Sequence, residues 1–147
     1  MNVKDILAGS QVQCATVQAD AKLTEAARKL SQAGTNLLVV RDFDGRLVGV
    51  VSKADIVSRI SHCSGCRCTE AVSTAMTTDV VQTVPHEDAR TVWERMRTAG
   101  VPNVPVVDRQ DRPIAILSAK DVLQAILGEV EYEEALLRDY IVGLGYR

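Results

Sequence analysis

The chain repeats itself, because one order of apolar runs and helix-like segments occurs twice within its 147 residues. In each copy an apolar run is followed by a helix-like segment, two further apolar runs and a second helix-like segment. These segments lie at 13–17, 24–33, 36–40, 46–51 and 52–60 in the first copy, and at 80–84, 89–99, 103–107, 113–117 and 118–127 in the second. Such a repeat limits the fold more strongly than any local propensity does, because both copies must fold alike and pack together.

The spacing of apolar residues predicts the type of each segment. Apolar residues in 23–30 follow the i, i+3, i+4, i+7 spacing of an amphipathic helix, and 92–99 keeps the same spacing in the second copy. The runs 37–40 and 104–107 are short, continuous and β-branched, which is typical of strands that are covered on both faces. Each copy is therefore predicted to fold as β-α-β-β-α, which gives the α+β class.

The register between the copies is predicted to change once along the chain. Asn36 lies over Asn103, 67 residues apart, whereas Ser52 lies over Ser118, 66 residues apart. We therefore expect the second copy to have lost one residue of the first hairpin, Gly45, because turns tolerate deletions best.

The repeat divides the chain into four parts: 1–62 as the first motif, 63–72 as a cysteine-bearing linker, 73–128 as the second motif, and 129–147 as an amphipathic C-terminal helix and tail. One face of that helix is formed by Tyr132, Leu136, Leu137, Tyr140 and Ile141. Such a face is too large to leave in water, so it is expected to pack on its own module or on a second chain.

Composition excludes several classes of function. Lys and Arg total 17 against 19 Asp and Glu, a net charge of −2, so the positive field that binds nucleic acid is missing and no such partner is expected. No apolar run approaches the roughly 20 residues of a bilayer span, and no signal-peptide core is present. We therefore expect a cytoplasmic protein with reduced cysteines and no membrane partner.

A serine followed three residues later by an aspartate opens the last helix of both copies, as Ser52 with Asp55 and as Ser118 with Asp121. By itself this spacing is a capping box with Asp in place of Glu. A helix N-terminus with free N–H groups also binds anions, and an Asp one turn further on can accept hydrogen bonds from a ribose diol. The recurrence at equivalent places favours a ligand-binding role.

Two segments resemble a known family. Segment 49–55, Gly-Val-Val-Ser-Lys-Ala-Asp, is similar to the Gly-x-x-Ser/Thr-x-x-Asp signature of CBS domains, which are named after cystathionine β-synthase. Segment 101–108, Val-Pro-Asn-Val-Pro-Val-Val-Asp, resembles their Pro-Val-Val-Asp strand. The resemblance covers residues 3–127. It implies two CBS motifs packed sheet to sheet around a pseudo-twofold axis into one module, with a C-terminal helix added.

The resemblance implies a regulatory sensor without catalytic activity. Such modules usually bind adenosine nucleotides (AMP, ADP or ATP, and sometimes NAD or S-adenosylmethionine) in two clefts between the motifs. The implied protein is a homodimer that acts through an effector protein of unknown identity and needs no cofactor besides the regulatory ligand. A hydrolase is not favoured, because the sequence shows no general base in a suitable place.

Carried over position by position, the resemblance assigns residues to two clefts. In the first, Gly49, Ser52 and Asp55 would hold the ribose and phosphate, and adenine would lie against Asp79, Val81, Val101 and Pro102. In the second, Ser118 and Asp121 would take this role, with Val12, Cys14, Thr35 and Asn36 around the base. The second copy has Ala115 in place of the signature glycine, so we expect the first cleft to be better formed.

The linker carries the alternative function. His62, Cys63, Cys66 and Cys68 offer soft ligands suited to zinc or an iron–sulfur centre, or thiols suited to a redox switch. Structural zinc sites usually combine two separated pairs of ligands, and this sequence has no second cysteine pair. A metal-binding or redox protein is thus the alternative hypothesis, while a polar linker is the simpler interpretation.

Overall fold

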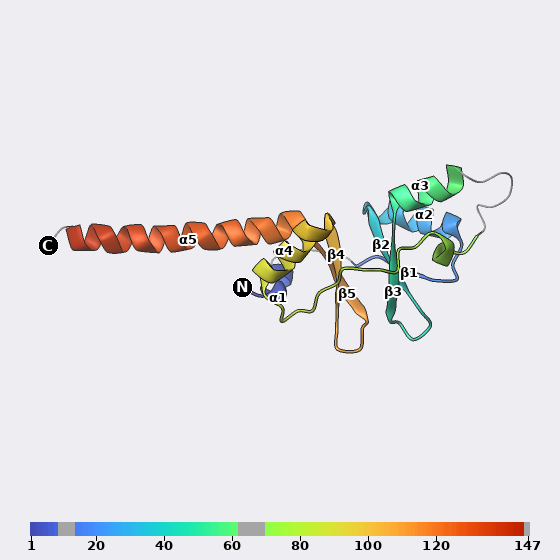
Figure 1. Cartoon of the computed structure of the whole chain (residues 1–147), viewed down its shortest axis with the longest axis horizontal. Coiled ribbons are helices and arrows are strands. Elements are labelled where there is room, and N and C mark those ends of the chain that lie inside the picture. The colour runs from blue at the N-terminus through green and yellow to red at the C-terminus, as the bar shows by residue number, and fades with distance from the viewer. Residues whose placement is uncertain (9–13, 62–69, 146–147) are drawn as a thin grey trace.

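The computed structural model describes residues 1–8, 14–61 and 70–145 and has the predicted α+β architecture (Figure 1). The elements in chain order are α1 (Val3–Ala8), β1 (Thr16–Gln18), α2 (Leu23–Ala33), β2 (Leu37–Arg41), β3 (Leu47–Ser52), α3 (Lys53–Ser61), the 3-10 helix η2 (Val72–Thr74), α4 (Ala89–Ala99), β4 (Asn103–Val107), β5 (Pro113–Ser118) and α5 (Ala119–Gly145). None of the helices within these ranges is both long enough and apolar enough to cross a membrane.

Two small sheets lie next to each other at the centre of the fold (Figure 1). In the first, β2 pairs in parallel with β1 and antiparallel with β3; in the second, β4 pairs antiparallel with β5. The strand predicted at 80–84 is reduced to a parallel bridge between Thr83 and Val106. Helices α2 and α3 pack on the first sheet, and α5 packs on β5 and α4.

The two copies keep a single register, 66 residues apart, from α2 to β5. Leu37 pairs with Ser52 in the first sheet, and Asn103 pairs with Ser118 in the second. Asn103 is therefore equivalent to Leu37, and the prediction that it lies over Asn36 is wrong. The error has a simple cause, because the aliphatic runs that follow these residues match almost equally well when shifted by one position.

The hairpin turns show the same register and correct the predicted deletion. Asp42 and Asp108 each accept hydrogen bonds through Oδ1 from the N–H groups two and four residues further on. Gly45 and Asp111 then take equivalent positive φ angles, 84° and 60°. Asp111 replaces Gly45 in the second turn, so both hairpins have the same length.

Each sheet completes its core with a segment from the other half of the chain. In the second core, Val3 and Ile6 of α1 are buried with residues of α4 and β4, and the Val3 N–H donates to the Glu87 carbonyl at 3.0 Å. In the first core, Val72 of η2 is buried with residues of α2 and β2, and its N–H donates to the Ala21 carbonyl at 2.8 Å. The two cores therefore do not follow the chain order in which the motifs are written.

Helix α5 is one continuous helix, where the sequence predicts a separate helix beyond Gly128. Gly128 has no atom within 4 Å of the position that a Cβ would take, so this part of the helix is uncrowded. An isolated glycine weakens a helix interior by only about 1 kcal/mol, which the neighbouring helix formers offset. The second half of α5 projects away from the body (Figure 1).

Candidate ligand-binding cleft

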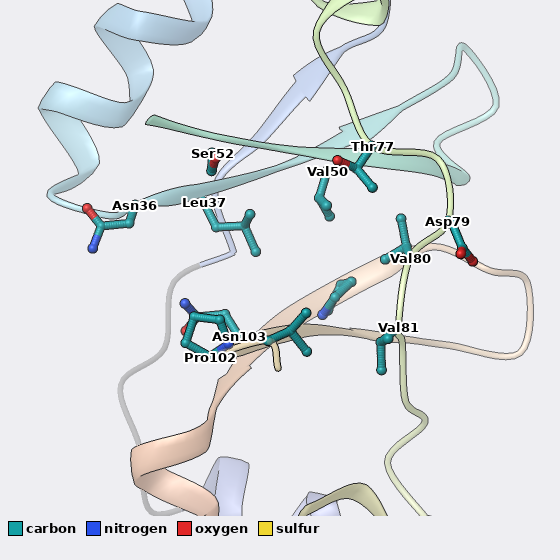
Figure 2. Close-up of a pocket in the computed structure, with 12 residues that line it drawn as sticks. Asn36, Leu37, Val50, Ser52, Thr77, Asp79, Val80, Val81, Pro102 and Asn103 are labelled. Carbon is teal, nitrogen blue, oxygen red and sulfur yellow. The ribbon is translucent and has the colours of Figure 1, made fainter. Parts of the chain in front are cut away.

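A cavity of about 250 Å³ lies between the two sheets (Figure 2). Its lining residues come from β2 and β3, from the connection at 77–81, and from β4 with the loop before it. They are Asn36, Leu37, Val50, Ser52, Thr77, Asp79, Val80, Val81, Val101, Pro102, Asn103 and Pro105. A molecule bound here would contact both copies of the repeat.

The cavity wall is mostly aliphatic and carries a few polar groups. Two side-chain amides, Asn36 and Asn103, lie toward one end of the cavity, and Asp79 lies toward the other (Figure 2). Neither amide forms a side-chain hydrogen bond within the described chain, so each keeps two donors and one acceptor for a ligand. An apolar cavity with a few polar groups at its ends is typical of a small-molecule site.

Ser52 reaches the cavity from the junction of β3 and α3. Its N–H donates to Asp55 Oδ2 at 2.9 Å, while the Asp55 N–H donates to Ser52 Oγ at 3.1 Å. These reciprocal bonds form the capping box and fix the serine at the helix start. The Ser52 hydroxyl still has its own proton to donate to a ligand.

Asp55 does not line this cavity. It borders a separate hollow of about 240 Å³ together with Ser58, Arg59, Thr74 and Ala75. One oxygen of the carboxylate is occupied by the capping bond to Ser52. The structure therefore separates the two members of the predicted Ser52/Asp55 pair between neighbouring hollows.

Gly49 is buried beside the cavity without lining it. A Cβ at this position would lie 2.7 Å from the Thr77 carbonyl oxygen and 2.9 Å from Met76 Sδ. Val50 and Thr77 exchange backbone hydrogen bonds of 3.0 and 2.8 Å across this contact. The glycine thus allows the connection at 77–81 to cross β3 closely, which brings Thr77 and its neighbours to the cavity.

The structure describes only part of the second predicted cleft. Ser118 caps α5 by accepting the Asp121 N–H at 3.1 Å, and both residues are half-buried outside the cavity of Figure 2. The Thr35 hydroxyl bonds to the backbone of Leu37. Cys14 is half-buried; burial raises the pKa of its thiol, and the charge of Arg41 partly opposes this. Val12 lies outside the described residues.

Five residues predicted for the first cleft do line one cavity, namely Ser52, Asp79, Val81, Val101 and Pro102. Asn36, predicted for the second cleft, lines the same cavity. The sequence reasoning missed Leu37, Val50, Thr77, Val80, Asn103 and Pro105. Strand alternation could have identified Val50, because Val51 is fully buried in the core and its neighbour must face the opposite side.

The alternative site in the linker cannot be described in the same way. His62, Cys63, Cys66 and Cys68 all lie outside the described residues. Within 1–8, 14–61 and 70–145, no group of three or more His, Cys, Asp or Glu side chains is arranged to hold a metal ion.

Comparison with known proteins identifies relatives over most of the chain. The family model for the CBS domain matches residues 3–62 and 72–128. The crystal structure of the CBS-domain protein ATU1752 from Agrobacterium tumefaciens is similar with a TM-score of 0.73 and 30% identity, over 85% of this chain and 98% of that one. The CBS domain pair of protein MJ0100, solved with 5′-methylthioadenosine and S-adenosyl-L-methionine, has a TM-score of 0.73 and 26% identity over 88% of this chain and 98% of that one.

Curated relatives include a much longer enzyme. The L-aspartate semialdehyde sulfurtransferase of Methanosarcina acetivorans is 27% identical over 120 residues. The match covers 82% of this chain but 23% of the sulfurtransferase, so the chain spans about a quarter of that relative's length.

Proposed function

Because the chain belongs to the CBS-domain family, we propose that it is a non-catalytic regulatory module that binds an adenosine-containing ligand between its two motifs. The cavity of Figure 2 carries this proposal, because its wall combines residues of both motifs. The structure of the MJ0100 CBS pair supports it, since that protein was solved with two adenosyl compounds.

The lining residues suit an adenine base. Leu37, Val50, Val80 and Val81 offer aliphatic surface, and none of the 12 lining residues is aromatic, so the base would be held by burial without ring stacking. An asparagine amide can pair with the adenine edge through one donor and one acceptor. Asn103 and Asn36 supply such amides at one end of the cavity.

Binding at this place would couple the two motifs. A ligand that contacts β2, β3 and β4 together stabilises the arrangement of the sheets in which those contacts form. An effector protein that recognises this arrangement would then respond to the ligand concentration. We propose no reaction for the chain, since the enzymes it resembles are about four times as long.

Isothermal titration calorimetry with adenosine and its derivatives tests the proposal. We predict that Ser52→Ala lowers the affinity about two- to tenfold, the factor expected for one hydrogen bond of roughly 0.5–1.5 kcal/mol. Ser118→Ala is the matched control, because it removes the equivalent helix cap without touching the cavity. Both variants should lose about 1 kcal/mol of stability.

The calorimetry also has a negative outcome. If no adenosine compound binds the wild-type chain, the proposed function is wrong. Equal losses of affinity in Ser52→Ala and Ser118→Ala would contradict the assignment of the ligand to this cavity.

We further propose that the module is a homodimer held together by α5. Val122, Ala125 and Ile126 on α5 pack against the second core. The same stripe continues past the body through Leu136 and Leu137, whose side chains are 52% and 60% exposed. A second copy would bring an identical stripe, and a self-complementary contact of this kind is typical of a twofold dimer.

A further inference from the structure

Charge is the property by which this cavity can distinguish among adenosine-containing ligands. Of its 12 lining residues only Asp79 is charged, and no Lys, Arg or His of the described chain is among them. Lys53 directly follows the lining residue Ser52, but it is exposed on α3 and does not line the cavity. A phosphate group in this cavity would therefore meet a carboxylate and no lining cation.

The first turn of α3 does not compensate for the missing cation. The Ser52 N–H donates to the Asp55 carboxylate, the Lys53 N–H to the Asn36 carbonyl at 3.1 Å, and the Asp55 N–H to the Ser52 hydroxyl. A helix N-terminus binds phosphate through N–H groups that have no partner in the protein. Three N–H groups at this helix start already have such partners, so little of the anion site is left.

The arrangement of the polar groups gives the ligand a direction. The amides of Asn36 and Asn103 lie toward one end of the cavity, and Asp79 lies at the rim of the other end (Figure 2). The valine surface lies between them, so an adenosine whose base meets the amides would direct its 5′ substituent toward Asp79. At that end a neutral substituent is tolerated, a cationic one is attracted, and an anionic one is repelled.

We infer that the cavity selects adenosine derivatives without phosphate, namely an adenosyl thioether or an adenosyl sulfonium, over AMP and ATP. The inference rests on the proposed function, because it narrows the ligand of the same cavity. The volume of about 250 Å³ agrees with it. Drug-sized ligands occupy roughly 300–1,000 Å³, so this space suits a nucleoside better than a nucleoside triphosphate.

Calorimetric titration of the full chain with four probes tests the inference: 5′-methylthioadenosine, S-adenosylmethionine, AMP and ATP. We expect both sulfur compounds to bind more tightly than both phosphates. AMP or ATP binding as tightly as 5′-methylthioadenosine would overturn the inference and leave the proposed function intact. Absence of binding for all four probes would overturn both.

A charge substitution tests the role of Asp79. Asp79→Asn should weaken S-adenosylmethionine, which carries a sulfonium cation, by about two- to fivefold, the factor expected for an exposed ion pair. It should leave neutral 5′-methylthioadenosine unchanged. Asp139→Asn, an equal change of charge on the projecting part of α5, is the control and should affect neither probe. An unchanged ratio of the two affinities in Asp79→Asn would overturn the role of this carboxylate.

Discussion

At the scale of single residues, Gly49 is the position where the sequence signature and the structure give different reasons for the same residue. The signature suggests a backbone that approaches a ligand, whereas the structure shows a backbone that approaches Thr77 and Met76. Its absent side chain therefore makes room for the chain itself, and through the connection at 77–81 it shapes the cavity.

A substitution at Gly49 should accordingly reduce stability. Gly49→Ala places a Cβ 2.7 Å from the Thr77 carbonyl oxygen, and overpacking of this kind costs about 1–3 kcal/mol. Urea denaturation followed by circular dichroism measures the loss. Gly128→Ala is the control, because it fills open space on α5 and should raise stability by up to about 1 kcal/mol. A Gly49→Ala protein as stable as the wild type would show that the connection moves freely.

Residues that belong to a pattern were predictable, and residues placed only by tertiary packing were not. Ser52 was identified because its spacing to Asp55 repeats in the second copy, and the hydrogen bonds of the capping box confirm that spacing. Thr77 and Val80 lie on a connection without periodicity. They line the cavity only because that connection crosses β3, which no local pattern indicates.

At the scale of elements, helices were easier to predict than the register between strands. The ends of α2 and α4 were predicted by Gly34 and Gly100, which take the left-handed conformation with φ of 63° and 69°. The strand register was wrong by one residue before the hairpins, because runs of Val and Leu match in more than one alignment. The turn residues Asp42 and Asp108 carry the unambiguous signal, since both make the same pair of side-chain bonds.

The element that calls for an experiment is α5. Replacement of Leu136 and Leu137 by serine should convert a dimer into a monomer, because it removes the apolar side chains that a second copy would cover. Size-exclusion chromatography with light scattering measures the mass in solution. Serine at Glu131 and Arg138, which lie on the opposite side of the helix, should leave the mass unchanged. A wild-type protein with the mass of one chain would contradict the proposed dimer.

At the scale of the whole molecule, the exchange of α1 and η2 should make the two halves unfold together. Val72 is fully buried in the first core, so Val72→Ala should cost about 2 kcal/mol. The single tryptophan, Trp93, packs against the second core. We predict that Val72→Ala lowers the urea midpoint of Trp93 fluorescence as much as that of circular dichroism.

The exposed Val57 on α3 provides the control for this experiment. Its side chain is 65% exposed, so Val57→Ala should change stability by less than about 0.5 kcal/mol. If Val72→Ala shifts circular dichroism but leaves the Trp93 transition in place, the halves unfold independently and the prediction is wrong.

The exchange of opening segments also bears on how the two copies find each other. A chain with one copy alone would carry an α1 that lacks its sheet and a core that lacks its η2, and two such chains could satisfy each other only by meeting in solution. In the tandem chain the connection between the copies holds both partners at a high effective concentration. The assembly of the ligand cavity is therefore an intramolecular event that does not depend on how much of the protein is present.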